Sequence, residues 1–268
     1  MRHIEWLVDS GIKISTIDGR TVEVFDFNHL DDAAIMSEWA KHFRNHYCSD
    51  NEIDVLRRGT GKSRSEFLLS IKFPDKKLGF GPGLRSGDFG EILIADFLEF
   101  VKAYWVPRTR YSNKTIRNES TKGADIIGFK YKVSPEVCSK DDELIVFEAK
   151  AQLSGNSPKA RLNDAIEGSL DDPIRLGESL NAIKQRLMDT GQATYERIDR
   201  FQDIVDNPFE QIFGAAAIFT EVVFDQSHIA TSTQSKHPPG TNSKLLVVKG
   251  IGLMELVHKL YKLASDEA

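Results

Sequence analysis

The sequence has few cysteines, no long apolar run and no internal repeat. Its 268 residues include only two cysteines, Cys48 and Cys138, too few for the disulfide framework of a small secreted domain. No stretch approaches the roughly 18 apolar residues that a membrane helix needs. A chain of this length forms one large domain or two small ones and buries a substantial core. We therefore expect a globular cytoplasmic protein with no membrane partner.

Several common catalytic motifs are also incomplete or absent. The segment RRGTGKS, residues 57–63, matches only the end of a phosphate-binding loop, because Leu56 stands where the first glycine belongs. No G-x-S-x-G nucleophile motif occurs. His42, His46 and Cys48 have a helical spacing that suits two metal ligands, but no second ligand pair such as C-x-x-C accompanies them. We therefore expect ordinary surface or core histidines here.

Acidic residues outnumber basic ones, which disfavours a protein that coats nucleic acid without specificity. The formal net charge is -5. One stretch, residues 102–132, has the opposite sign, with eight basic residues against Glu119 and Asp125 and a local charge of +6. The stretch is either a solvated surface or a surface that binds the DNA backbone. The candidate DNA-binding residues are Arg108, Arg110, Lys114, Arg117 and Lys122.

Hydrophobic patterning predicts an N-terminal α+β region and a larger domain after it. Residues 1–80 contain strand-like runs and one helix-like segment, and they end at the glycine-rich sequence GFGPGLRSG. We expect a boundary there, which assigns residues 81–268 to the second domain. In the first region we expect strands at 21–27 and 66–73 and a helix at 31–43.

The second domain alternates helices with strands, so we expect an α/β fold with a mixed sheet that has helices on both faces. The predicted elements are a helix at 88–104, strands at 125–131 and 143–152, polar helices within 158–206, strands at 212–224 and 244–249, and a helix at 253–264.

Three acidic positions and one lysine carry the chemistry. Side chains alternate along a strand, so Glu148, Lys150 and Gln152 point to one face. If the two central strands form a hairpin with residue 132 opposite 143, Asp125 faces Lys150 on that same face. Glu91 would join them from the preceding helix. A slip of one residue would separate these faces.

Converging carboxylates are costly unless a cation compensates them. Asp and Glu oxygens suit Mg²⁺, and Mn²⁺ is a possible substitute, so we expect metal-assisted phosphodiester hydrolysis. Each residue also has an ordinary interpretation. An E-x-K pair is common in edge strands, and Asp125 can end a turn. Asp88 and Glu91 also form a D-x-x-E capping box.

The order of helix glutamate, G-x-D and E-x-K resembles the PD-(D/E)xK nucleases over about residues 86–152. The resemblance implies a restriction-endonuclease-like αβββαβ core. Asp125 would match the motif's aspartate, Glu148 and Lys150 its (D/E)xK, and Glu91 the helix glutamate. Gln152 would match a polar residue seen in some members, and Ala124 stands where the motif has proline.

The segments RSGDFGEILIADFLE, TKGADIIGF and DELIVFEAKAQL resemble the HamA family, the nuclease subunit of the Hachiman anti-phage defence system. This resemblance implies a compact region before the nuclease core and a superfamily 2 helicase partner, HamB.

We therefore expect an Mg²⁺-dependent deoxyribonuclease with catalytic residues Glu91, Asp125, Glu148, Lys150 and Gln152. Asp125, Glu148 and Glu91 would bind the metal. Two alternatives remain open: a DNA-binding or regulatory subunit without chemistry, and a restriction endonuclease that works without a helicase.

Overall fold

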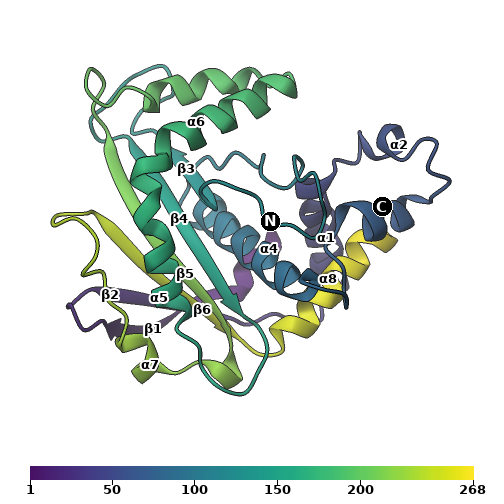
Figure 1. Ribbon diagram of the computed structural model, residues 1–268, viewed down its shortest axis with the longest axis horizontal. Coiled ribbons are helices and arrows are strands. Elements are labelled where there is room, and N and C mark those ends of the chain that lie inside the picture. Colours follow the sequence, from purple (N-terminus) through teal and green to yellow (C-terminus); the bar gives the residue numbers. More distant parts are fainter.

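A computed structural model describes residues 1–268, and its centre is a six-stranded mixed sheet (Figure 1). The strand order is β1-β2-β6-β5-β4-β3. The outer pairs β1–β2 and β4–β3 are antiparallel, and the inner pairs β2–β6, β6–β5 and β5–β4 are parallel. Helices cover both faces of the sheet, which confirms the predicted α/β fold. The strands are β1 (Leu7–Ser15), β2 (Thr21–Phe27), β3 (Ile126–Lys130), β4 (Glu143–Gln152), β5 (Glu210–Thr220) and β6 (Ser243–Gly250).

The central strands are apolar because both of their faces are covered. Nearly every residue of β5 is buried, as is usual for an inner parallel strand. The α-helices are α1 (Ala33–Tyr47), α2 (Ile53–Leu56), α3 (Arg64–Phe67), α4 (Gly81–Asp96), α5 (Arg161–Gly168), α6 (Asp172–Asp189), α7 (Gln226–Ala230) and α8 (Leu253–Asp266). Four 3-10 helices (Arg2–Trp6, Ser169–Asp171, Ala193–Phe201, Glu221–Val223) and two π-helical turns (Leu68–Lys72, Phe97–Val101) complete the set.

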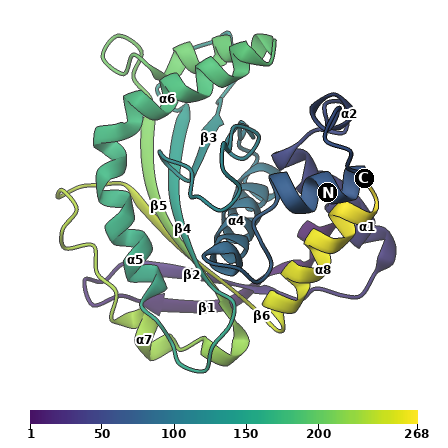
Figure 2. The same ribbon diagram turned by 45° about the vertical axis from the view of Figure 1, so that its right-hand side comes forward.

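Helices α1, α4 and α8 pack on one face of the sheet, and α5, α6 and α7 lie on the other (Figure 2). The first face carries the largest core, which includes Trp39, Phe89 and Tyr261. The second face has two smaller cores, one under α5 and one under α6. Side chains of β4 alternate between these two faces, so the strand can present polar groups to α5 and α6 while its other side packs on α4.

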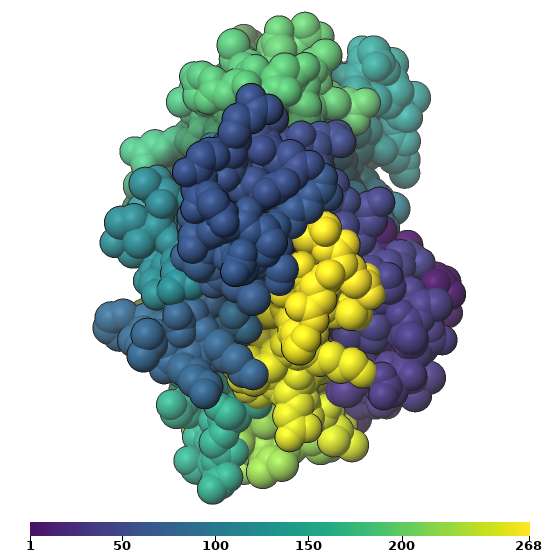
Figure 3. All heavy atoms as spheres, turned by 90° about the vertical axis from the view of Figure 1, so that its right-hand side faces the viewer, coloured from purple at the N-terminus to yellow at the C-terminus, as the bar shows by residue number.

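Residues from the two ends of the chain share one core. Helix α8 packs along α1 and also contacts α3, and Figure 3 shows α8 in yellow between N-terminal segments in blue and purple. Strands β1 and β2 join the same sheet as the later strands, through β6. The predicted regions 1–80 and 81–268 therefore share a sheet and a core. The boundary at residue 81 remains a prediction about independent folding.

Most predicted elements are confirmed, including strands β2 and β4 and helices α1 and α8. The strand predicted at residues 66–73 is wrong, because this segment is helical. Ser63 and Glu66 form a capping box that starts α3, and Phe67 and Leu68 are buried while Leu69 and Ile71 are exposed. Two adjacent buried residues fit a helical face better than they fit the alternation of a strand.

The helix predicted at residues 88–104 starts seven residues earlier, at Gly81, with Pro82 in its first turn. Asp88 and Glu91 therefore lie inside α4, and the capping-box interpretation of Glu91 is wrong. The predicted hairpin register is wrong as well, because Lys130 pairs with Glu143 where residue 132 was expected. Asp142 ends the ladder early by accepting hydrogen bonds from the backbone N–H groups of Lys132 and Ser139. This change of two residues preserves the faces and places Asp125 beside Glu148.

None of the helices combines the length and the apolar character that spanning a bilayer requires.

Candidate active site at the edge of the sheet

Helix α4 brings Glu91 to the sheet through a close contact at the preceding glycine. A Cβ atom on Gly90 would lie 3.1 Å from Cδ1 of Ile218 and 3.3 Å from Cβ of Ala151. The missing side chain therefore lets α4 approach β4 and β5 closely. Glu91 follows directly, and its side chain is 12 % exposed.

Asp125 lies immediately before β3 and is bound to the neighbouring strand. Its Oδ2 accepts a hydrogen bond of 3.1 Å from the backbone N–H of Ala149. Because Ala149 lies between Glu148 and Lys150, this bond holds the Asp125 carboxylate next to both candidate residues of β4. The contact explains how the β3–β4 hairpin brings the two parts of the motif together.

Glu148 and Lys150 extend from β4 toward α5 and α6, and the Lys150 ammonium donates a hydrogen bond to Glu148 Oε1. Helix α5 closes over Glu148 at Gly168, where a Cβ atom would lie 2.8 Å from Glu148 Oε1. Burial, followed by the Asp125 charge and contact, raises the pKa of Glu148 to about 7. Burial lowers the pKa of Lys150, but the Glu148 hydrogen bond and the Asp125 charge outweigh it and raise that pKa.

Arg110 bridges Glu91 and Asp125. Its Nε lies 2.9 Å from Glu91 Oε2, and its Nη2 lies 2.7 Å from Asp125 Oδ1. The same guanidinium donates to the backbone carbonyls of Gly123 and Ala124, so it also supports the turn before β3. Tyr111 donates its hydroxyl hydrogen to Glu91. Burial and the Asp125 charge nevertheless raise the pKa of Glu91 to about 8.

A fourth carboxylate, Asp172, faces the same site from the start of α6. Its residue exposure is 4 %, and its buried Oδ2 has no hydrogen-bond partner. Burial and the charges of Glu148 and Asp125 raise its pKa to about 7. Ser179, two helical turns further along α6, lies 3.5 Å from the N–H of Ala124. Ser179, after Asp172 in the sequence, thus contacts the segment before Asp125. Gly168, before Asp172, packs against Glu148.

Asp172 was not predicted from the sequence, because its local context is that of an ordinary helix start. The segment DDP places acidic residues before a proline, which is typical of the first turn of a helix. Only the packing of α6 over β3 and β4 brings this residue to the site.

Gln152 has a different environment from the one predicted. Its Nε2 donates to the carbonyl of Ser157 at 2.8 Å, and its Oε1 accepts from the N–H of Lys159 at 2.9 Å. The amide group therefore braces the loop after β4. These contacts place the Gln152 amide outside the group of carboxylates. Its role in catalysis stays a prediction.

Most of the predicted DNA-binding cations already have carboxylate partners. Arg108 pairs with Asp96 and Glu99, Lys114 with Asp88, and Arg117 with Asp75. Arg110 pairs with Glu91 and Asp125, as described above. Lys122 is exposed and has no ion pair, so it is the member of the set whose charge is available at the surface.

These residues form what we call the carboxylate site: Glu91, Asp125, Glu148 and Asp172, with Lys150 and Arg110. Four acidic groups face two cations, and burial together with the neighbouring carboxylates raises the pKa of Glu91, Glu148 and Asp172. A cavity of ≈ 60 Å³ lies beside Glu91, Asp125 and Arg110, on the side of the site away from Glu148, Lys150 and Asp172, which do not line it. The oxygen ligands, the excess negative charge and the unpartnered buried oxygen of Asp172 are a donor set that suits a divalent cation.

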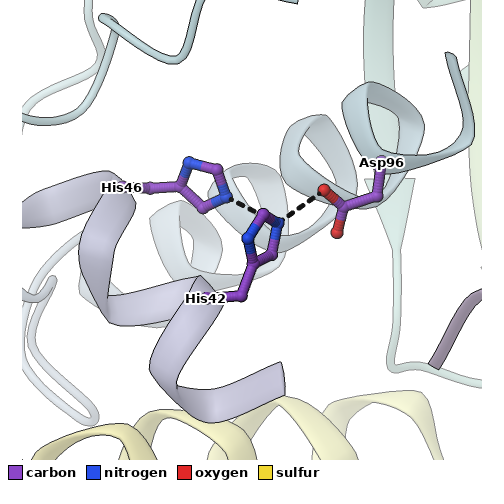
Figure 4. Close-up of side chains that lie close together, drawn as sticks. All are labelled: His42, His46 and Asp96. Atoms are coloured by element: carbon purple, nitrogen blue, oxygen red, sulfur yellow. Dashed lines mark hydrogen bonds and ion pairs between the residues drawn. The ribbon is translucent and has the colours of Figure 1, made fainter. Parts of the chain in front are cut away.

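A second cluster lies between α1 and the end of α4 (Figure 4). His42 and His46 of α1 and Asp96 of α4 place their ligand atoms within 4.8 Å of one another and could hold a metal ion. Spacing in the sequence groups His42 and His46 with Cys48, whereas the third ligand atom here comes from Asp96, 50 residues from His46. We call these three residues the histidine cluster.

The fold and the carboxylate site define an α/β protein with a buried acidic site at the edge of a mixed sheet. The chain belongs to the HamA family, whose family model matches residues 1–264. Family membership supports a role in anti-phage defence. No match is found among curated protein sequences.

Proposed function

We propose that this protein is a metal-dependent DNA nuclease that acts in anti-phage defence by hydrolysing phosphodiester bonds. The observation that carries the proposal is the carboxylate site, where acidic groups from α4, β4, α6 and the start of β3 surround one lysine. A protein that only binds DNA has no physical use for excess carboxylates that repel phosphate. HamA membership agrees with this activity.

Asp125, Glu148 and Glu91 are the residues that would hold Mg²⁺, or Mn²⁺ in its place. When bound, the ion would lower the pKa of a coordinated water and polarise a phosphate oxygen. Lys150 carries a permanent positive charge beside Glu148, so it can hold a phosphate oxygen as negative charge develops on it. The pKa of about 7 at Glu148 describes the metal-free site, and a bound cation would favour the ionised carboxylate that serves as its ligand.

Arg110 and Tyr111 orient the acidic groups. The guanidinium holds Glu91 and Asp125 in a fixed relation, and the tyrosine hydroxyl fixes one oxygen of Glu91. Such preorganisation reduces the rearrangement that catalysis would otherwise require.

The proposed substrate is DNA and the proposed partner is a superfamily 2 helicase of the HamB type. Both follow from family membership. The proposed location, the cytoplasm, is where phage DNA and such a helicase would be met.

The direct test incubates the full chain with plasmid and linear DNA in Mg²⁺, Mn²⁺ or chelator, with and without the helicase and ATP. We expect cutting that needs the metal, and a loss of about 10²–10³-fold in the Lys150→Ala variant. The lysine is 35 % exposed, so the variant should keep its fold, as its circular dichroism and melting temperature would report. Lys140→Ala, which removes an exposed lysine without an ion pair, is the matched control. Cutting by Lys150→Ala at the wild-type rate would remove Lys150 from the mechanism.

A further inference from the structure

Three Lewis bases from two helices meet in the histidine cluster. His42 and His46 stand four residues apart on α1, so both rings project from one face of that helix. Asp96, the last residue of α4, faces them from across the helix pair (Figure 4). His46 and Asp96 are buried, and the His42 side chain is 15 % exposed.

The distances between the ligand atoms suit a tetrahedral metal ion. His42 Nε2 lies 2.9 Å from Asp96 Oδ1 and 3.2 Å from His46 Nε2. Zinc binds imidazole nitrogen and carboxylate oxygen at about 2.0–2.2 Å, which places neighbouring tetrahedral ligands about 3.3 Å apart. These two separations need only a small expansion to admit an ion, and all three ligand atoms lie within 4.8 Å of one another.

Hydrogen bonds alone cannot satisfy all three ligand atoms of the cluster. An ionised carboxylate has no hydrogen, and each ring nitrogen carries at most one. His42 Nε2 has one hydrogen to share between Asp96 Oδ1 and His46 Nε2, and without it Asp96 Oδ1 and His42 Nε2 direct lone pairs at each other. A metal ion would accept all three lone pairs at once.

Groups outside the cluster hold the Asp96 carboxylate in place. His3 Nε2 occupies Oδ2 at 3.0 Å and Arg108 Nη2 contacts Oδ1 at 2.8 Å. Outer groups of this kind orient ligands in metal sites.

Arg108 leaves room for a second cation because a carboxylate oxygen has two lone pairs. One lone pair of Oδ1 accepts from Arg108, and the other remains for the ion. Arg108 also donates to Glu99 at 2.6 and 2.9 Å, so this second carboxylate offsets its charge. Asp96 and Glu99 together exceed Arg108 by one negative charge before any ion binds.

We infer that His42, His46 and Asp96 bind one divalent transition-metal ion of the zinc class. Imidazole ligands select such ions over Mg²⁺, which prefers oxygen. The ion joins α1, from the N-terminal part of the chain, to α4, the helix that presents Glu91 to the carboxylate site. Its proposed role is therefore structural: the bound ion would hold α1 and α4 together.

The test measures metal binding by the full chain after tag removal and treatment with chelator. Zn²⁺ titrated by calorimetry should bind with one equivalent, and Co²⁺ should give the visible absorption bands of a tetrahedral site. His42→Gln and His46→Gln should each weaken Zn²⁺ binding at least about 10- to 100-fold, the loss found even for outer-shell changes. Bound Zn²⁺ should raise the melting temperature of the wild type and not that of either variant.

Two controls make the result specific. His258→Gln changes a histidine of α8 that has no metal-ligand partners and should bind Zn²⁺ as the wild type does. Glu148→Gln removes a residue of the carboxylate site and should also retain the zinc equivalent, so the outcome is independent of nuclease activity. If His46→Gln does not fold, the wild-type cobalt spectrum and the partly exposed His42 decide the matter.

Absence of stoichiometric Zn²⁺ or Co²⁺ binding by the wild type would overturn the inference. So would equal binding by His42→Gln, or loss of the zinc equivalent in Glu148→Gln, which would place the ion at the carboxylate site.

Discussion

Helix α4 presents two carboxylates five residues apart, and each meets an arginine from the segment that follows the helix. Glu91 meets Arg110 in the carboxylate site, and Asp96 meets Arg108 beside the histidine cluster. At Glu91 other carboxylates crowd the ion pair, and burial with the Asp125 charge raises its pKa to about 8. At Asp96 donors surround the carboxylate, and its pKa falls despite burial.

Similar ion pairs therefore produce opposite electrostatic environments on one helix. The carboxylate site has an excess of hard oxygen donors, which favours Mg²⁺ or Mn²⁺. The histidine cluster has two imidazoles and one carboxylate, which favours a softer ion. The neighbours of an ion pair therefore decide which cation it can accept.

The largest effect is expected when either of the two arginines is replaced. Arg110→Ala and Arg108→Ala each leave buried carboxylates without their cation, so each should lower the free energy of unfolding by about 3–5 kcal/mol. Mg²⁺ should restore part of the loss in Arg110→Ala, because the ion can replace the missing charge among oxygen ligands. It should restore little in Arg108→Ala. Denaturant titration with and without Mg²⁺ measures both, and equal recovery in the two variants would contradict the distinction.

Asp172 provides a pH-dependent test of crowding in the carboxylate site. Its pKa rises from 3.8 to about 7 on folding, so the folded metal-free chain holds this proton more tightly than the unfolded chain. That contribution favours folding at low pH and is lost as pH rises from about 4 to about 7. Asp172→Asn should therefore stabilise the metal-free protein at pH 8, by at most about 4 kcal/mol, and much less at pH 4.

Melting temperatures at the two pH values, in chelator, measure the effect. Asp171→Asn is the matched control, because this neighbouring carboxylate is 55 % exposed and pairs with Arg175 at the surface. It should change stability by less than about 1 kcal/mol. A stabilisation by Asp172→Asn that does not depend on pH would show that neither burial nor the neighbouring carboxylates raise the pKa of Asp172.

The response of the melting temperature to Mg²⁺ tests the carboxylate site in the unmodified chain. Mg²⁺ at 100 times its dissociation constant should stabilise the wild type by about 2.7 kcal/mol. For a domain of this size, that corresponds to about 5–10 °C in melting temperature. Glu148→Gln should lose this response, while Glu167→Gln, an exposed residue of α5 paired with Lys236, should keep it. A full Mg²⁺ response in Glu148→Gln would move the ion elsewhere.

The local patterns of the sequence predict much of this fold and of the carboxylate site. Strands β2 and β4 and helix α1 follow from alternation and periodicity, and the order of Glu91, Asp125, Glu148 and Lys150 follows from a motif. The segment at 66–73 was misread because a short apolar run fits either a strand or a helix until its burial is known.

Local sequence patterns could not predict contacts between segments that lie far apart in the chain. Asp172 reaches the site because α6 packs over the hairpin, and Asp96 meets His42 across 54 residues of sequence. The basic stretch presents the same difficulty, because a run of positive charge does not reveal which members point inward. Arg108, Arg110 and Lys114 all neutralise buried or partly buried carboxylates.

The smallest expected effect is therefore that of replacing Lys122. It lies exposed three residues before Asp125, so it can contact a DNA phosphate beside the carboxylate site. Lys122→Ala should weaken DNA binding a few-fold and reduce the slope of log affinity against log salt by about 1, the change expected for one phosphate contact. Binding measured over a range of salt concentrations reports this slope, with Lys140→Ala as the control. An unchanged slope would remove Lys122 from the DNA-binding residues; the other four candidates, Arg108, Arg110, Lys114 and Arg117, already pair with carboxylates.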